Sequence, residues 1–385
     1  DCTNYYFEID LENGDRQKGP SKENRHDPII GQALLLDADQ IPIGMMMYPG
    51  NESEKHYLRK MIEDTKERYD VDGRIIQVAD KGLNCARNIY AAVKEANDGY
   101  IFSKSVHGKY LSEVEKEWVL LEDNDKNRWI NVLDDNGKIK YRYKECVDEF
   151  TYHCYLSEDD EKETYFKVKE KRVVTFNPSL ARKQRQQINK EIEKAKTILT
   201  IKEASKDDFG DSAKYVKFEA KDKNGKKVKI KPELIMDKIN EDLALAGYNL
   251  LVTSEINLDA EEIYNAYHGL WRIEESFRIM KSYLEARPVF LQKEESIYGH
   301  FLICYLSLVI LRLLELKIFN DELPVNQIVE FIRNYSVTDT GEGTFVNNAT
   351  KSKTFLKIKD QLGLAKLGNL FLKKRDIDLL LKTEF

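Results

Sequence analysis

Apolar residues recur at helical spacing in the stretch from Tyr267 to Leu284. Steps of three and four residues separate the members of one apolar stripe, which are Ile273, Phe277, Met280 and Leu284. Asp259 stands where the helix would begin, and Glu262 follows three residues later, as in a capping box. Because the residue before a proline disfavours helical geometry, we expect the helix to end before Arg287-Pro288. The pattern predicts one amphipathic helix with its apolar side buried.

The opposite side of this predicted helix carries charges and aromatic rings. Its members recur at three- and four-residue steps and are Tyr267, Trp271, Glu274, Arg278 and Lys281. Two interpretations follow from the pattern alone. The face is either an ordinary solvated surface, or a functional face in which one carboxylate lies among cations and aromatic rings.

The first hundred residues alternate between the strand period and the helix period. The predicted elements are a strand at Asp1–Ile9, a hairpin at Gln32–Tyr48, a helix at Ser53–Tyr69, a strand at Arg74–Asp80, a helix at Asn84–Ala96 and a strand at Tyr100–Ser103. This order predicts an α/β fold of the RNase H-like type, with a mixed sheet flanked by helices. Asp80 ends a strand, where ligands collect in such sheets, although a turn residue suits Asp80-Lys81-Gly82 equally well.

A β-rich insertion follows and separates this part from the predicted glutamate-bearing helix. Its expected strands are Trp118–Leu121, Trp129–Leu133, Lys138–Tyr143, Tyr165–Phe176, Lys214–Ala220 and Lys226–Ile230. Hairpin turns are expected at Asn136-Gly137 and Asn224-Gly225, and one charged helix at Ser179–Leu199. The chain therefore divides into a first part of the catalytic core (1–105), the insertion domain (106–246), a second part of the core (247–316) and a C-terminal helical region (317–385).

Composition is that of a globular protein, with 42% hydrophobic and 33% charged residues among 385. The longest apolar run, Phe301 to Leu311, is shorter than the roughly 20 residues that span a bilayer, so we expect no membrane association. No signal-peptide pattern is present, and the five cysteines show no disulfide or metal-finger spacing, so the cytoplasm is the expected compartment. A net charge of -6 argues weakly against nucleic acid as a partner, but basic residues gather at 182–196 and 221–231, which leaves room for a basic groove.

Three carboxylates stand at comparable places in these elements: Asp1, Asp80 and Glu274. Two divalent cations about 3.5 to 4 Å apart need several carboxylate oxygens from different elements, and Mg²⁺ prefers such oxygen ligands. Spacing in the sequence does not by itself establish that the three converge, since the chain holds 67 Asp and Glu residues.

These segments resemble those of the DDE transposases of bacterial insertion sequences. The resemblance is to the branch whose signature reads Tyr, two residues, Arg, three residues, Glu, six residues, Lys, and Tyr267, Glu274 and Lys281 match that register. The second aspartate of the family lies in a segment similar to VADKGL at Val78–Leu83, and the first in one similar to DCTNYYFE, which begins at Asp1. The resemblance covers essentially the whole chain, including the insertion.

The resemblance implies a metal-dependent DNA transposase that cleaves the ends of an insertion sequence and transfers the strands to target DNA. Asp1, Asp80 and Glu274 would be catalytic and would bind two Mg²⁺ or Mn²⁺ ions. Tyr267 and Lys281 would hold phosphates of the terminal strand. The expected partner is double-stranded DNA, both terminal inverted repeats and target, bound by a homodimer in a synaptic complex, and the expected location is the nucleoid of a bacterium or archaeon.

Three further residues are candidate DNA contacts from their positions on the helix. Arg272 and Arg278 are expected to contact phosphates, and Trp271 either stacks on a base near the cleavage site or belongs to the core. A two-carboxylate glycosidase is disfavoured, because the cations beside Glu274 favour its ionised form over a proton donor.

Two features depart from the family pattern. Leu270 stands where the signature has arginine, so one phosphate contact is missing or is taken over by Arg272. The chain also begins at the first catalytic aspartate, so we expect it to be a piece of a longer, N-terminally truncated protein. The alternative function is a non-cleaving DNA-binding or dimerising remnant that interferes with the full-length transposase.

Overall fold

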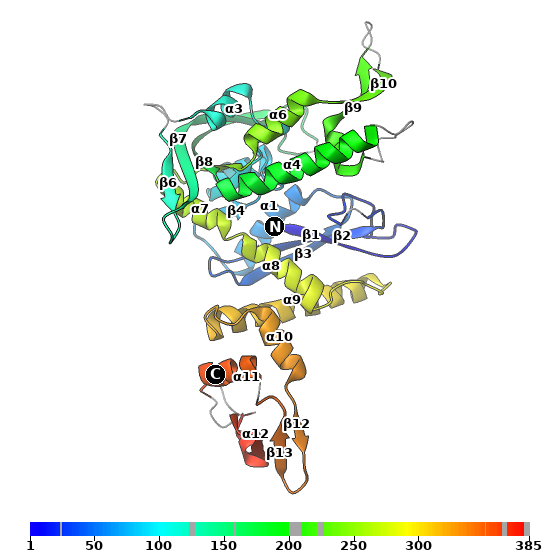
Figure 1. Ribbon diagram of the computed structural model, residues 1–385, viewed down its shortest axis with the longest axis vertical. Coiled ribbons are helices and arrows are strands. Elements are labelled where there is room, and N and C mark those ends of the chain that lie inside the picture. The colour runs from blue at the N-terminus through cyan, green and yellow to red at the C-terminus, as the bar shows by residue number, and fades with distance from the viewer. Residues whose placement is uncertain are drawn as a thin grey trace. The chain divides into compact units, whose positions relative to one another are not determined.

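The computed structural model describes residues 1–23, 25–122, 128–157, 159–199, 209–221, 227–350, 352–363 and 368–380 (Figure 1). The chain divides into two compact units, which are described separately below. The first unit comprises Asp1–Val71 and Trp271–Phe385, and the second comprises Asp72–Leu270. Mixed sheet and flanking helices confirm the predicted α/β, RNase H-like class. The division into four parts by residue number stays a prediction.

The first unit is built on a three-stranded antiparallel sheet in the order β1-β2-β3. The strands are β1 (Cys2–Tyr6), β2 (Ile29–Leu36) and β3 (Pro42–Pro49). The predicted hairpin is confirmed, and its turn is closed by the Asp37 carboxylate, which accepts the N–H of Ile41 at 2.8 Å. Gln40 takes a positive φ of 68° in this turn.

Helices pack on both faces of this sheet, because successive strand residues point to opposite sides. Helix α1 (Glu54–Arg68) lies on one face, where Tyr57 stacks on Tyr48 of β3 with ring centroids 4.3 Å apart. The other face is covered by α8 (Trp271–Arg278), the π-helical segment η4 (Ile279–Tyr283) and α9 (Glu294–Leu313). The predicted stripe packs there, with Ile273, Phe277 and Met280 buried and Leu284 partly buried.

The remainder of the first unit continues from α9 into smaller elements. These are the π-helical η5 (Leu314–Ile318), α10 (Val325–Asn334), β12 (Val337–Asp339), β13 (Thr344–Asn347), α11 (Lys353–Gln361), β14 (Phe371–Lys373) and α12 (Lys374–Leu380). The three strands form a small antiparallel sheet in the order β12-β13-β14. The sequence predicts only helices for residues 317–385, so this small sheet is not among the predicted elements.

The second unit is built on a six-stranded mixed sheet in the order β4-β5-β11-β8-β7-β6. Its strands are β4 (Ile76–Ala79), β5 (Gly99–Lys104), β6 (Ile130–Leu133), β7 (Ile139–Cys154), β8 (Thr164–Phe176) and β11 (Tyr248–Thr253). β4 and β5 are parallel and the other neighbours antiparallel. The long strands of the predicted insertion thus continue the same sheet as β4, β5 and β11.

Helices and two further strands complete the second unit. They are α2 (Ala86–Tyr90), the π-helical η1 (Ala91–Glu95), the short η2 (Gly108–Tyr110), α3 (Glu113–Leu120), α4 (Pro178–Leu199), η3 (Gly210–Tyr215), β9 (Val216–Lys221), β10 (Lys227–Leu234), α6 (Met236–Leu245) and α7 (Ala260–His268). The predicted charged helix is confirmed as α4, and the Asn136-Gly137 turn as the connection between β6 and β7. The expected turn at Asn224-Gly225 lies outside the described residues.

The predicted strand at Trp118–Leu121 is wrong, because these residues end helix α3. A capping box starts that helix: Ser112 Oγ accepts the N–H of Glu115 at 3.2 Å, and Glu115 Oε2 accepts the N–H of Ser112 at 2.7 Å. Two paired terminal donors outweigh the strand propensity of Trp and Val. The insertion therefore holds α3 and α6 in addition to the expected α4.

The predicted glutamate helix is present but interrupted. Its capping box is confirmed, since Asp259 and Glu262 bond reciprocally at the start of α7. The N–H of Leu270 bonds to the carbonyl of Tyr267, three residues back, so the α-helical pattern breaks before α8 begins at Trp271. The boundary between the two units falls at this break.

Candidate functional site

Asp80 and Tyr267 meet within the second unit. Asp80 follows the last residue of β4, and its carbonyl accepts the N–H of Leu83 at 3.0 Å, which forms the turn expected from Asp-Lys-Gly. Its carboxylate has a separate partner, because the Tyr267 hydroxyl donates to Asp80 Oδ1 at 2.9 Å. Helix α7 brings Tyr267 to this strand end by packing Ile263 on the sheet. Two residues singled out separately in the sequence thus form one contact.

Glu274 lies on the exposed side of α8 in the first unit. No hydrogen bond or ion pair of its carboxylate occurs among the described residues. The adjacent Glu275 is turned toward the interior, with its side chain 15% exposed and ion-paired to Arg272 at 3.1 Å. Neighbouring residues of a helix differ by about 100° in direction, which separates the two carboxylates.

Asp1 directly precedes strand β1, at the edge of the first unit's sheet. Its Oδ1 accepts the N–H of Cys2 at 2.7 Å, and its amino group donates to the carbonyl of Leu34 at 3.0 Å. Asp1 and Glu274 belong to the first unit and Asp80 to the second. Within the part of the chain that the structure describes, no three His, Cys, Asp or Glu side chains are grouped closely enough to hold a metal ion.

Lys281 lies in the π-helical segment after α8, against the sheet of the first unit. Its Nζ is 3.3 Å from Glu23 Oε1 and 5.1 Å from the centre of the Tyr5 ring. Arg287 pairs with the same carboxylate, so two cations share Glu23. Burial lowers the pKa of Lys281, and the charge of Arg287 adds to that shift, whereas Glu23 opposes it.

The other three predicted DNA contacts, Arg278, Trp271 and Arg272, differ in their exposure and in their partners. Arg278 is exposed over 63% of its side chain, with one guanidinium nitrogen 3.1 Å from Glu275. Trp271 is 51% exposed, so the alternative of a core tryptophan is wrong, and the Arg272 guanidinium lies 4.0 Å from its ring centre. Arg272 itself is buried and paired to Glu275 and Asp321. Its donors therefore face protein carboxylates and not the solvent side where DNA would bind.

A family model described as the transposase DDE domain matches residues 10–310. The chain belongs to the transposase DDE domain family. The match includes Asp80, Tyr267, Glu274 and Lys281 and begins after Asp1, and it confirms the resemblance at the level of the family. Comparison with the curated proteins finds no match. Among the helices that the structure describes, none is both long enough and apolar enough to cross a bilayer.

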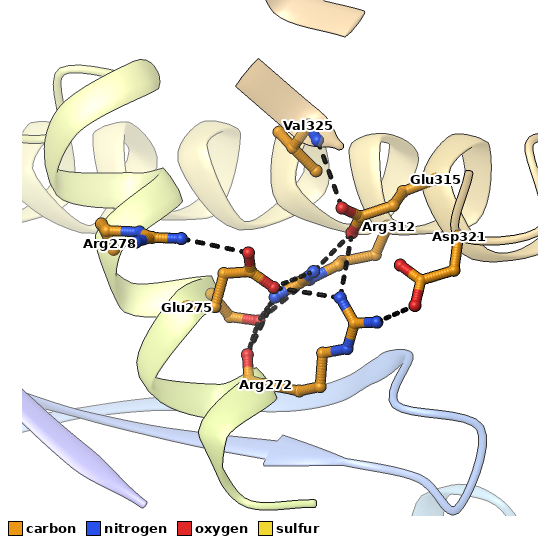
Figure 2. A network of polar contacts seen from close by, with 8 residues as sticks. Arg272, Glu275, Arg278, Arg312, Glu315, Asp321 and Val325 are labelled. Carbon is orange, nitrogen blue, oxygen red and sulfur yellow. Dashed lines mark hydrogen bonds and ion pairs between the residues drawn. The ribbon is translucent and has the colours of Figure 1, made fainter. Parts of the chain in front are cut away.

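In this transposase-family domain, the helix that carries Glu274 is tied to the core by a buried arginine (Figure 2). Arg312 of α9 is 0% exposed and donates to Glu275 Oε2 at 2.9 Å, to the carbonyl of Arg272 at 2.9 Å and to Ser276 Oγ at 3.0 Å. It also pairs with Glu315 at 2.5 Å, whose other oxygen accepts the N–H of Val325 at 3.2 Å. The network joins α8, α9 and the start of α10.

The charges of this network hold Glu275 ionised. Burial alone would raise the pKa of Glu275, but the hydrogen bonds and charges of Arg312 and Arg272 outweigh burial, so the pKa is lowered. The sequence pattern does not single out these residues, and Arg312 is there only the residue that follows the apolar run Phe301 to Leu311. A single arginine at the end of an otherwise apolar helix was the available signal, since such a charge needs a buried partner.

A second buried network lies in the second unit, around Glu170 of β8. Glu170 is 0% exposed and accepts the hydroxyls of Tyr100 at 2.5 Å and Tyr152 at 2.6 Å and Nε of Arg172 at 2.7 Å. Arg172 also pairs with Glu115, which Lys104 binds at 2.8 Å. A cavity of about 840 Å³ opens beside this network, and its lining includes Lys81, Asn84, Lys104, Tyr152, His153 and Arg172. Because Lys81 follows Asp80 in the chain, the cavity begins next to that strand end.

Proposed function

We propose that this domain is a DNA transposase that cleaves strands at insertion-sequence ends and transfers them to target DNA in a metal-dependent reaction. Family membership over residues 10–310 supports the class of activity. The observation that carries the proposal further is the contact of Tyr267 with Asp80, because it joins two signature positions 187 residues apart. A carboxylate oriented by a phenol at the end of a strand is suited to ligate a cation.

Asp1, Asp80 and Glu274 are the proposed ligands of two Mg²⁺ or Mn²⁺ ions. Their donor set fits these hard cations, which prefer carboxylate oxygens. Glu274 also has no protein partner among the described residues, and only one oxygen of Asp80 is engaged by Tyr267. Bound ions of this kind supply activation of an attacking oxygen and stabilisation of a leaving one.

The surrounding side chains are proposed to bind and orient the DNA. Tyr267 holds the Asp80 carboxylate through its hydroxyl, in addition to the phosphate contact that the family signature implies. Arg278 binds a phosphate, Lys281 binds another by exchanging its ion pair with Glu23, and the exposed ring of Trp271 stacks on a base. Arg272 is left out of this set because its guanidinium is buried against carboxylates. The partners would be terminal repeats and target DNA, held by a homodimer.

The test is nicking of a supercoiled plasmid that carries the DNA flanking the coding sequence, with Mn²⁺ added. Wild-type protein should nick the plasmid only with metal, and Glu274→Gln should lower the rate by about a thousandfold, because the amide removes one metal-binding charge. Glu330→Gln, at an exposed glutamate of α10, is the matched control and should keep full activity.

The outcome decides between the two functions considered from the sequence. A wild-type chain that binds the plasmid but does not nick it, with Mn²⁺ or with Mg²⁺ in its place, would contradict the proposal and support the non-cleaving DNA-binding remnant. Equal nicking by wild type and Glu274→Gln would show that another group performs the reaction.

A further inference from the structure

Helix α9 is apolar on two sides. From Ser296 to Leu311 it contains no Asp, Glu, Lys or Arg. One side is buried in the core of the first unit through Ile297, Phe301, Cys304, Leu308 and Leu311. The other side is exposed, and its large residues are Leu302 (49% exposed), Ile303 (67%), Leu306 (52%), Ile310 (59%) and Leu313 (40%). We call these five residues the α9 stripe.

The size of this stripe is unusual for a surface that stays in water. At these exposed fractions the five side chains present on the order of 400 Å² of apolar area, which is as large as the largest patch on many monomers. Charged residues interrupt most solvated helix faces, but none interrupts this one between Glu295 and Arg312. The stripe therefore has the chemistry of a surface that another apolar surface covers.

The order of residues along the stripe is symmetric about Leu306. Leu302 and Ile310 lie four residues before and after it, and Gly299 and Leu313 lie seven residues before and after it. Steps of four and seven residues keep one face of an α-helix. Two copies of such a face can pack antiparallel with the two Leu306 residues at the symmetry axis. Leu302 then lies against residue 310 of the second copy, and Gly299 lies against residue 313.

Gly299 supports this pairing independently. A glycine inside a helix costs about 1 kcal/mol relative to alanine, so its presence calls for a reason. Packing within the chain supplies none, because a Cβ at Gly299 would meet no atom within 4 Å. Opposite Leu313 of an antiparallel copy, the missing side chain leaves room for a close approach of the helices.

Charges at the two ends of the stripe agree with the same arrangement. Glu295 lies eleven residues before Leu306, and Lys317 lies eleven residues after it, in the π-helical η5 that follows α9, so Lys317 marks the end of the stripe and does not keep its α-helical register. Glu295 is exposed, and Lys317 keeps 49% of its side chain exposed although Asp39 binds it at 2.6 Å. An antiparallel pair would therefore bring unlike charges together at both ends, whereas a parallel pair would bring like charges together.

We propose that the α9 stripe is a self-association surface that pairs with the α9 stripe of a second copy of this chain, antiparallel about Leu306. Two stripes bury on the order of 800 Å² of apolar area, and with their flanking residues they reach the lower range of specific interfaces, near 1,000 Å². This pairing would be the contact that forms the homodimer of the proposed function. The pairing itself is inferred from the stripe, and only its role in transposition rests on the proposed function.

The experiment is sedimentation equilibrium of the DNA-free chain over concentrations of about 1 to 100 µM, which detects dissociation constants in the micromolar range. Wild type should form dimers, and Leu306→Asp should weaken dimerisation by at least a hundredfold, because two buried carboxylates would face each other. Ile332→Asp introduces an aspartate at an exposed isoleucine of α10, outside the five residues of the α9 stripe, and should leave the mass unchanged. Circular dichroism checks that each variant is folded.

A charge-exchange pair tests the antiparallel register. Leu302→Glu and Ile310→Lys should each weaken the dimer. The double variant should dimerise at least tenfold more tightly than either single variant, since residue 302 of one copy faces residue 310 of the other. A wild-type chain that stays monomeric, a Leu306→Asp variant that dimerises normally, or a double variant without recovery would each overturn the proposal. Because DNA and metal are absent, failure here is distinct from failure of strand cleavage.

Discussion

The two units of this protein bury ion networks built around opposite charges. In the first unit a cation, Arg312, lies at the centre and the carboxylates of Glu275 and Glu315 surround it. In the second unit a carboxylate, Glu170, lies at the centre, with two tyrosine hydroxyls and Arg172 around it. The first network joins helices through side chains, whereas the second links residues on strands of one sheet, together with Glu115 of α3.

This difference determines how much each network contributes to the fold. Neighbouring strands are already held in register by backbone hydrogen bonds, so the network around Glu170 adds to an arrangement fixed by other means. Helices α8 and α9 have only their side chains to fix their relative position. We therefore expect the first unit to depend more strongly on its buried charge than the second.

Removal of the central cation should give the largest effect. Arg312→Met leaves Glu275 and Glu315 buried without their main partner, so the free energy of unfolding should fall by about 3–5 kcal/mol. Hydrogen exchange measured peptide by peptide should show faster exchange in α8 and α9 and little change in the second unit. Arg278→Met, at a 63% exposed arginine, is the control, with an expected loss below about 1 kcal/mol. Equal losses in the two variants would contradict the expected role of Arg312.

Removal of the central carboxylate should cost less. In Glu170→Gln the amide oxygen still accepts a tyrosine hydroxyl, but Arg172 loses a charged partner, so we expect a loss of about 2–3 kcal/mol. Urea unfolding measures it, and Glu149→Gln, at a glutamate that is 56% exposed on β7, should change stability little. A loss larger than that of Arg312→Met would reverse the comparison between the units.

Acid should weaken the second network through Glu115. Burial would raise the pKa of Glu115, but the bonds from Lys104, Ser112 and Arg172 outweigh burial and lower the pKa from 4.5 to about 2. A carboxylate with a depressed pKa stabilises the fold above its unfolded value and loses that contribution as the pH falls through the folded value. Glu115→Gln should therefore be less stable than wild type by about 1–2 kcal/mol at pH 7, after allowance for solvent screening.

The difference between wild type and Glu115→Gln should shrink as the pH falls from 4.5 toward 2. Chemical unfolding of both proteins across this interval provides the measurement. A difference that stays constant with pH would show that the charge of Glu115 does not contribute to stability.

Tyr267→Phe should have the smallest effect on stability, about 0.5–1.5 kcal/mol, because it deletes the hydrogen bond to Asp80 and keeps the ring. The rate of plasmid nicking should fall about tenfold, and a higher Mn²⁺ concentration should be needed for the half-maximal rate. Tyr165→Phe, at a 68% exposed ring on β8, is the control. An unchanged metal requirement would remove Tyr267 from the orientation of Asp80.

Local patterns in the sequence predicted much of the fold. The buried stripe of α8, the capping box at Asp259 and the hairpin closed by Asp37 all depend on residues within a few positions of one another. For helix α3 the local patterns conflict, because the apolar residues Trp118 to Leu121 favour a strand and the capping box at Ser112 favours a helix.

The networks could not be predicted in the same way, because their partners are distant in the sequence. Arg312 and Glu275 are 37 residues apart, and Tyr100 and Glu170 are 70 residues apart. The signature register singles out Glu274, but nothing in the local sequence shows that the neighbouring Glu275 pairs with the buried Arg312. The same limit explains why Arg272 was expected to contact phosphate.

The π-helical segment η4 has a consequence for reading such signatures. A π-helical turn accommodates one residue more than an α-helical turn, so it rotates everything that follows it about the helix axis. Glu274 precedes this segment and Lys281 lies within it, and the lysine is accordingly directed to Tyr5 and Glu23 on the sheet side. The number of residues between the signature glutamate and lysine therefore gives their separation along the chain, while the number of residues in the intervening helical turn decides which way the lysine points.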